Sequence, residues 1–81
     1  AVELAPRGIR VNSVAPTFIE TPMTQPMLAD PDFRTFVLGS IPLGRVGTVR
    51  DVADAVLYLA SPAARMVTGH SLLVDGGWTA Q

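Results

Sequence analysis

Two short apolar runs along the chain predict strands. The first lies between Gly8 and Pro16 and is rich in β-branched side chains, and the second extends from His70 to Val74. Apolar runs of this length between turn residues are typical of buried strands. Asp75-Gly76-Gly77 follows the second run, in a turn where glycine can adopt positive φ. The carboxyl end of the first strand, from Ala15 to Thr21, is where an open α/β sheet would meet a ligand.

A helix is predicted between these strands. Thr48 and Asp51 form a pattern like a capping box, so the helix should begin at Val49, and Ser61-Pro62 should end it. Apolar residues recur at intervals of three and four and would form one stripe: Val49, Val52, Ala53, Val56, Leu57 and Ala60. Strand, helix and strand in this order predict a βαβ unit with parallel strands.

The segment from Thr21 to Leu43, called the lid below, is too long for a plain connection. Asp30-Pro31-Asp32 supplies an N-cap, a proline and an early carboxylate for one short amphipathic helix, which Gly39 could end. The lid carries adaptable or bulky apolar side chains: Met23, Met27, Leu28, Phe33 and Phe36. These side chains suit an apolar substrate and suit packing against a core equally well.

The ends and the composition of the chain predict an incomplete core. Ala1 to Ala5 has helical spacing that stops at Pro6, as in the last turns of a helix that begins outside the chain and covers one face of the sheet. Hydrophobic residues make up 48% of the 81 residues and charged ones 16%, which is very apolar for so small an isolated domain. Further strands should therefore lie beside the first strand.

Charge and residue types exclude several classes of partner. The net charge is -1 and the six cations are scattered arginines, so we expect neither a nucleic-acid nor a membrane surface. The absence of cysteine and the single histidine exclude a disulfide scaffold and argue against a metal site. No apolar run approaches the roughly 20 residues that cross a bilayer, and a cytoplasmic location is the expectation.

The order of motifs resembles the C-terminal third of a short-chain dehydrogenase/reductase. The matching segments are VELAPRGIRVNSVAP, the T-x-M at Thr21 to Met23, IPLGRVGTVRDVADAVLYLAS and VTGHSLLVDGG. The resemblance implies a doubly wound, parallel, Rossmann-like sheet that binds NAD or NADP. Residues 1–81 would be the C-terminal segment of that single domain (strand, lid with a short helix, helix, strand), incomplete on their own.

The resemblance also implies a cofactor site at the end of the first strand. The family's Pro-Gly-x-x-x-Thr pattern is matched by Pro16, Thr17, Phe18, Ile19 and, after Glu20, Thr21. The Ile19 amide and carbonyl would bind the nicotinamide carboxamide, and the Thr21 hydroxyl would add a bond to the cofactor. Thr17 departs from the usual glycine, and a β-branched residue is unfavourable if the turn needs positive φ. For Thr21, a purely local cap before Pro22 is the alternative.

The family's reacting groups are absent from this chain. Its acid or base is a tyrosine followed four residues later by a lysine, with a serine that orients the substrate. This chain has no lysine, and its one tyrosine, Tyr58, is followed at that spacing by Pro62. Gly44 and Gly47 do not make a phosphate-binding loop. The chain is therefore expected to hold no catalytic residue and to be inactive alone.

The resemblance implies a role for the chain within a larger enzyme. That enzyme would be an NAD(P)-dependent oxidoreductase that moves hydride between nicotinamide and an alcohol or carbonyl substrate of unspecified identity. The family's packing implies a homo-oligomer, dimer or tetramer, through Val49 to Trp78. The alternative is a non-catalytic interaction module that binds another subunit through its helix and last strand.

Overall fold

A computed structural model describes all residues from 1 to 81. It contains two strands, β1 (Ser13–Pro16) and β2 (Ser71–Val74), and three α-helices, α1 (Gln25–Leu28), α2 (Pro31–Ser40) and α3 (Val49–Ala60). Single turns of 3-10 helix occur at Ala5–Arg7, Pro62–Ala64 and Trp78–Ala80. The two strands pair in parallel, with Ser13 opposite Ser71 and Pro16 opposite Val74. The predicted βαβ unit is therefore confirmed, with α3 as the connection.

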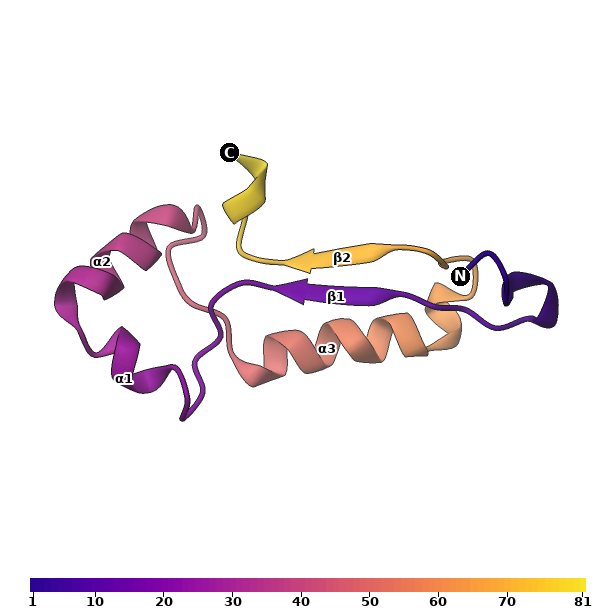
Figure 1. The fold of residues 1–81 in the computed structure, drawn as a ribbon, viewed down its shortest axis with the longest axis horizontal. Coiled ribbons are helices and arrows are strands. Elements are labelled where there is room, and N and C mark those ends of the chain that lie inside the picture. The colour runs from indigo at the N-terminus through magenta and orange to yellow at the C-terminus, as the bar shows by residue number, and fades with distance from the viewer.

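The carboxyl ends of both strands point toward the same end of the molecule. Figure 1 shows α1, α2 and the C-terminal turn at that end, α3 alongside the strands, and the N-terminus at the opposite end. The molecule is elongated, measuring 50 × 27 × 20 Å. Its radius of gyration is 15.5 Å, whereas a compact domain of this length would have about 12 Å. The chain thus does not form a compact globule by itself, as its apolar composition predicts.

Both predicted helix starts are confirmed by their caps. The Asp30 carboxylate accepts hydrogen bonds from the amides of Asp32 and Phe33, at 3.0 and 3.4 Å. At α3, the Asp51 amide donates to the Thr48 hydroxyl at 3.3 Å, and the Thr48 amide donates to the Asp51 carboxylate at 2.8 Å. Gly39 does not end α2, which continues to Ser40, and the lid contains the additional short helix α1.

The first strand begins later than its apolar pattern predicts. Ile9 and Val11 precede β1 and are 46% and 43% exposed. The Asn12 side chain explains where pairing starts, because it accepts a hydrogen bond from the His70 amide and donates one to the Val67 carbonyl, both at 3.0 Å. The first of these bonds occupies the His70 amide, which a longer ladder would pair with the Val11 carbonyl.

Most of the predicted apolar stripe on α3 is not buried by this chain. Among the apolar residues of α3, Val52 and Ala55 are half-buried and only Leu59 is buried. The other members of the predicted stripe are exposed: Val49, Ala53, Val56, Leu57 and Ala60. The helix is apolar on two sides, and a two-stranded sheet covers only one of them.

The N-terminal residues do not cover the sheet, contrary to expectation. Residues 1–9 are exposed, and Val2 has 87% of its surface accessible. They form a turn beyond the amino end of β1 (Figure 1), so their apolar side chains contribute nothing to the core.

The main core lies at the lid end of the molecule. Four buried side chains form it: Leu28, Val37, Ile41 and Val46. Partly buried residues pack against them: Phe18, Phe33, Leu38 and Trp78. The core therefore holds the lid against the turn that follows β1 and against the C-terminus.

Candidate functional site

The turn after β1 is fixed by backbone pairing on both sides. The Thr17 amide donates to the Val74 carbonyl at 3.2 Å, which extends the β1 ladder by one residue. Ile19 then forms an isolated parallel bridge with Gly47. Gly47 permits this approach, because a Cβ there would lie 2.6 Å from the Ile19 Cδ1 atom.

The bridge to Gly47 does not use the backbone groups of Ile19 itself. The Gly47 amide donates to the Phe18 carbonyl at 3.0 Å, and the Glu20 amide donates to the Gly47 carbonyl at 2.8 Å. Backbone groups of successive residues in extended chain point to opposite sides, so the Ile19 N–H and C=O face away from Gly47. The Ile19 N–H has no hydrogen-bond partner in the chain.

Thr21 and Thr24 close the next turn through reciprocal bonds. The Thr21 amide donates to the Thr24 Oγ1 atom at 2.9 Å, and the Thr24 amide donates to the Thr21 Oγ1 atom at 3.3 Å. The Thr24 hydroxyl also donates to the Ile19 carbonyl at 2.6 Å. Thr21 thus caps the turn locally, as the alternative for this residue predicts. Thr24 was missed from the sequence, although its spacing from Thr21 is that of a capping box.

A pocket of about 360 Å³ opens at this turn, lined by Thr17, Phe18, Ile19, Thr21 and Thr24. It brings together four of the five residues predicted to bind a cofactor. The fifth, Pro16, is the last residue of β1 and does not line the pocket. No residue other than glycine has positive φ, so Thr17 adopts this turn without left-handed strain.

The predicted lid residues lie in different environments. Leu28 is 3% exposed and belongs to the core, whereas Met23 and Met27 are 86% and 47% exposed. Phe33 packs edge-on against the Phe18 ring at a centroid distance of 5.6 Å. Phe36 packs edge-on against Trp78 at 6.3 Å and remains 61% exposed.

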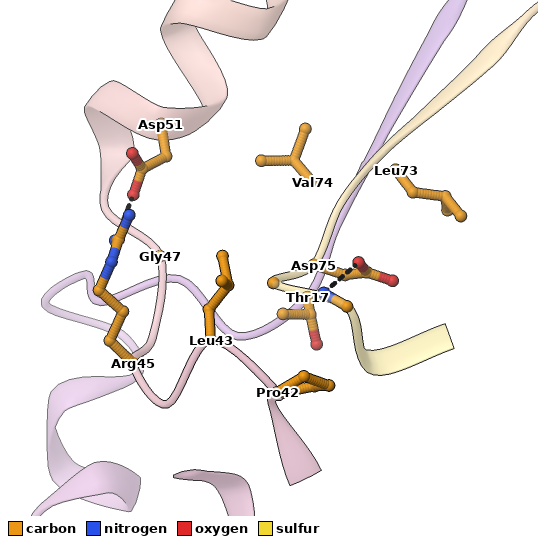
Figure 2. A pocket seen from close by; sticks show the side chains of 11 residues that line it. Thr17, Pro42, Leu43, Arg45, Gly47, Asp51, Leu73, Val74 and Asp75 are labelled. Carbon is orange, nitrogen blue, oxygen red and sulfur yellow. Dashed lines mark hydrogen bonds and ion pairs between the residues drawn. The ribbon is translucent and has the colours of Figure 1, made fainter. Parts of the chain in front are cut away.

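A larger cleft of about 560 Å³ lies between the end of β2 and the start of α3 (Figure 2). Its eleven lining residues are Thr17, Pro42, Leu43, Arg45, Gly47, Asp51, Leu73, Val74, Asp75, Gly76 and Gly77. Figure 2 shows the Asp51 carboxylate bonded to Arg45, at 3.2 Å, and Asp75 bonded within its own turn.

Both carboxylates of this cleft are occupied by structural bonds. The Thr48 amide, with Arg45 and the Thr48 hydroxyl, lowers the pKa of Asp51. The Thr79 hydroxyl, with the amides of Gly77 and Thr79, lowers the pKa of Asp75. Carboxylates stabilised in their charged form are poor proton donors or acceptors near neutral pH, so neither suits general acid-base catalysis. Asp54, one turn further along α3, pairs with Arg50 at 3.6 Å.

Other kinds of site are not formed by this chain. No group of three or more His, Cys, Asp or Glu side chains is arranged to hold a metal ion. Tyr58 is 45% exposed on α3 and lines neither the 360 Å³ pocket nor the 560 Å³ cleft. None of the helices has both the length and the apolar character needed to span a membrane.

Similarity to known proteins covers nearly the whole chain. Residues 1–79 match the family model described as enoyl-(acyl carrier protein) reductase. Over 80 residues the chain is 50% identical to 2-(R)-hydroxypropyl-CoM dehydrogenase of Xanthobacter autotrophicus, covering 99% of this chain and 32% of that protein. The chain thus spans about a third of the length of this curated relative.

Solved structures agree with the sequence match. 4-Hydroxyisoleucine dehydrogenase complexed with NADH superposes with a TM-score of 0.96 and 33% identity, over 100% of this chain and 33% of its own. Gluconate 5-dehydrogenase from Burkholderia cenocepacia, in complex with NADP and tartrate, has a TM-score of 0.91 and 35% identity, over 99% of this chain and 31% of its own. The resemblance seen in the sequence is therefore confirmed: the chain belongs to the short-chain dehydrogenase/reductase family and matches the C-terminal part of its Rossmann fold.

Proposed function

We propose that this chain forms the nicotinamide side of the cofactor site in an NAD(P)-dependent oxidoreductase. The enzyme would move hydride between the nicotinamide and an alcohol or carbonyl carbon of a small substrate. The single observation that carries the proposal is the unpaired N–H of Ile19 at the carboxyl end of β1. A donor left free at this edge of a parallel sheet lies where such folds bind ligands.

The polar groups around Ile19 fit a carboxamide. A carboxamide has one carbonyl acceptor and an NH₂ group with two donors. The Ile19 N–H can donate to that carbonyl, while the Ile19 carbonyl oxygen keeps one lone pair after accepting from Thr24. Relatives solved with NADH and with NADP support this class of ligand. The bound nicotinamide supplies the hydride chemistry, and this turn would fix which ring face meets the substrate.

The lid would close over the substrate with its exposed methionines. Met27 is 47% exposed and lies in α1, which follows the Ile19 turn directly. Leu28 belongs to the core and the partly buried Phe33 packs against it. Both side chains would therefore support the lid. We expect Met27→Ala to change the ratio of kcat/KM values between substrates more than it changes thermal stability. The reverse result would assign Met27 to packing.

Exposed apolar side chains on α3 and on β2 would serve assembly. Val49 and Leu57 are 62% and 68% exposed on α3, and Leu73 is 54% exposed on β2. Exposed apolar surface of this kind is where protein partners bind. We propose a homo-oligomer through the region from Val49 to Trp78. A non-catalytic module that binds another subunit through its helix and last strand is the second candidate, and the same exposed side chains favour it.

Cofactor binding by the complete protein tests the central proposal. Titration should quench or enhance the fluorescence of NADH or NADPH, and the preferred cofactor is the one that saturates at lower concentration. The 81-residue chain should show no turnover, since it has no lysine and no Tyr-x-x-x-Lys. A complete protein that leaves both fluorescence signals unchanged would reject the cofactor site. Assembly with another protein would then favour the interaction module.

A further inference from the structure

The Thr24 hydroxyl has hydrogen-bond partners for its proton and both lone pairs within the turn that carries the proposed site. It lies 2.6 Å from the Ile19 carbonyl oxygen, 2.9 Å from the Thr21 amide nitrogen and 3.3 Å from both the hydroxyl and the carbonyl oxygen of Thr21. A threonine hydroxyl offers one proton and two lone pairs. These four contacts therefore leave Thr24 nothing for a ligand.

The single proton of the Thr24 hydroxyl determines which partner donates in each of these hydrogen bonds. The shortest contact, to the Ile19 carbonyl, takes the Thr24 proton, because a carbonyl can only accept. In the longer contact between the two hydroxyls, at 3.3 Å, only Thr21 then has a proton to donate. The Thr21 oxygen accepts from the Thr24 amide and retains one lone pair. The hydroxyls thus form a directed chain from Thr21 through Thr24 to Ile19, in which each bond polarises the next.

This chain determines what the pocket offers to a ligand. One donor remains, the Ile19 N–H, beside two acceptors, the second lone pair of the Ile19 carbonyl and that of the Thr21 hydroxyl. One donor and two acceptors complement a primary carboxamide, with its one carbonyl and two N–H groups. We infer that Thr24 is a positioning residue, which orients the Ile19 carbonyl and makes the Thr21 hydroxyl an acceptor toward the nicotinamide carboxamide. The inference rests on the proposed cofactor site.

A purely structural role predicts a different outcome. If Thr24 only caps the turn before α1, its loss lowers stability and weakens all cofactors alike. If Thr24 orients acceptors, its loss weakens only cofactors that carry the carboxamide N–H donors. A cofactor analogue with a 3-acetylpyridine ring separates these outcomes, because it keeps the ring carbonyl and has a methyl group in place of NH₂.

The experiment compares kcat/KM for the natural cofactor and the acetylpyridine analogue in the complete enzyme. Thr24→Val removes the hydroxyl, and Thr24→Ser retains it. Thr35→Val is the matched control, since the Thr35 hydroxyl also donates to a lid carbonyl, that of Pro31 at 2.8 Å, without contacting Ile19. Melting temperatures of all variants are measured beside the kinetics.

We expect Thr24→Val to lower kcat/KM for the natural cofactor about three- to tenfold, as loss of one hydrogen bond predicts. The value for the analogue should change less than about twofold, and Thr24→Ser and Thr35→Val should behave like wild type. An equal loss for both cofactors would overturn the positioning role. A wild-type enzyme that does not discriminate between the cofactors would instead reject the proposed contact between the carboxamide NH₂ group and the Ile19 carbonyl.

Folding failure is also informative. If Thr24→Val does not fold, Thr24→Ala removes the same hydroxyl with a smaller side chain and takes its place. If neither variant folds while Thr24→Ser does, the hydroxyl is needed for the fold itself, and the positioning role is overturned.

Discussion

At the lid end of the molecule Leu28, Val37 and Ile41 are 3%, 0% and 2% exposed, whereas Val2 and Met66 at the opposite end are 87% and 94% exposed. The lid thus builds its own core, and it does so around the turn that carries Ile19. The sheet unit, formed by β1, α3 and β2, leaves apolar side chains uncovered on α3 and β2. The comparison teaches that the geometry of the proposed site is held by a core within this chain, while the sheet unit leaves much of its apolar surface uncovered.

Truncating a side chain in each region gives the largest expected contrast. Ile41→Ala removes a buried side chain of the lid core and should cost about 2–5 kcal/mol of unfolding free energy. Leu57→Ala, on the exposed face of α3, should change it by less than about 0.5 kcal/mol in the monomer. Chemical denaturation of both variants at a concentration where the protein is monomeric makes the comparison. A similar loss of unfolding free energy in the two variants would contradict the difference in packing between the two regions.

Gly76 lies at the junction between β2 and the lid, and its substitution tests how tightly the two are packed there. Gly76 has φ +61°, and a Cβ there would lie 2.5 Å from the Ile41 Cγ2 atom. We expect Gly76→Ala to destabilise the protein by about 1–3 kcal/mol, from backbone strain and displacement of Ile41. Gly39→Ala is the control, since Gly39 lies within α2 with open space around it, and it should stabilise by about 0.5–1 kcal/mol. A neutral Gly76→Ala would show that the junction tolerates movement.

The smallest effect expected is a loss of stability in acid. The pKa values of Asp51 and Asp75 are lowered in the folded state, so the unfolded chain binds protons more readily at these groups. Their contribution is complete above the ordinary carboxyl pKa and is lost as pH falls through it toward the lowered folded values. Asp51→Asn and Asp75→Asn should each flatten the fall in melting temperature below about pH 4. If the curves of melting temperature against pH are parallel for wild type and variants, the hydrogen bonds of Asp51 and Asp75 do not contribute to the loss of stability in acid.

Features that depend only on neighbouring residues were predicted correctly from the sequence. The caps at Asp30 and Thr48 were predicted because each needs only neighbours a few residues away. The stripe on α3 did not reveal which side of the helix this chain buries, because that depends on where the two strands lie against the helix. The start of β1 depends on Asn12 bonding across 55 or more positions to Val67 and His70, which no local pattern reveals.

Part of the proposed site was predictable in the same way. The family pattern identified Ile19 and Thr21, and the pocket brings them together. The bridge to Gly47 is a contact between distant segments, and only the fold shows that it turns the Ile19 amide outward. Thr24 could have been found from its spacing to Thr21, but its bond to the Ile19 carbonyl follows from the path of the turn.

A crystal structure of the complete protein with its preferred nicotinamide cofactor tests the central claim most directly. We predict that the carboxamide oxygen lies within about 3.2 Å of the Ile19 amide nitrogen, with the carboxamide nitrogen at the Ile19 carbonyl. The Thr24 hydroxyl should keep its bond to that carbonyl. A nicotinamide ring bound elsewhere, with the Ile19 amide donating to water, would contradict the account.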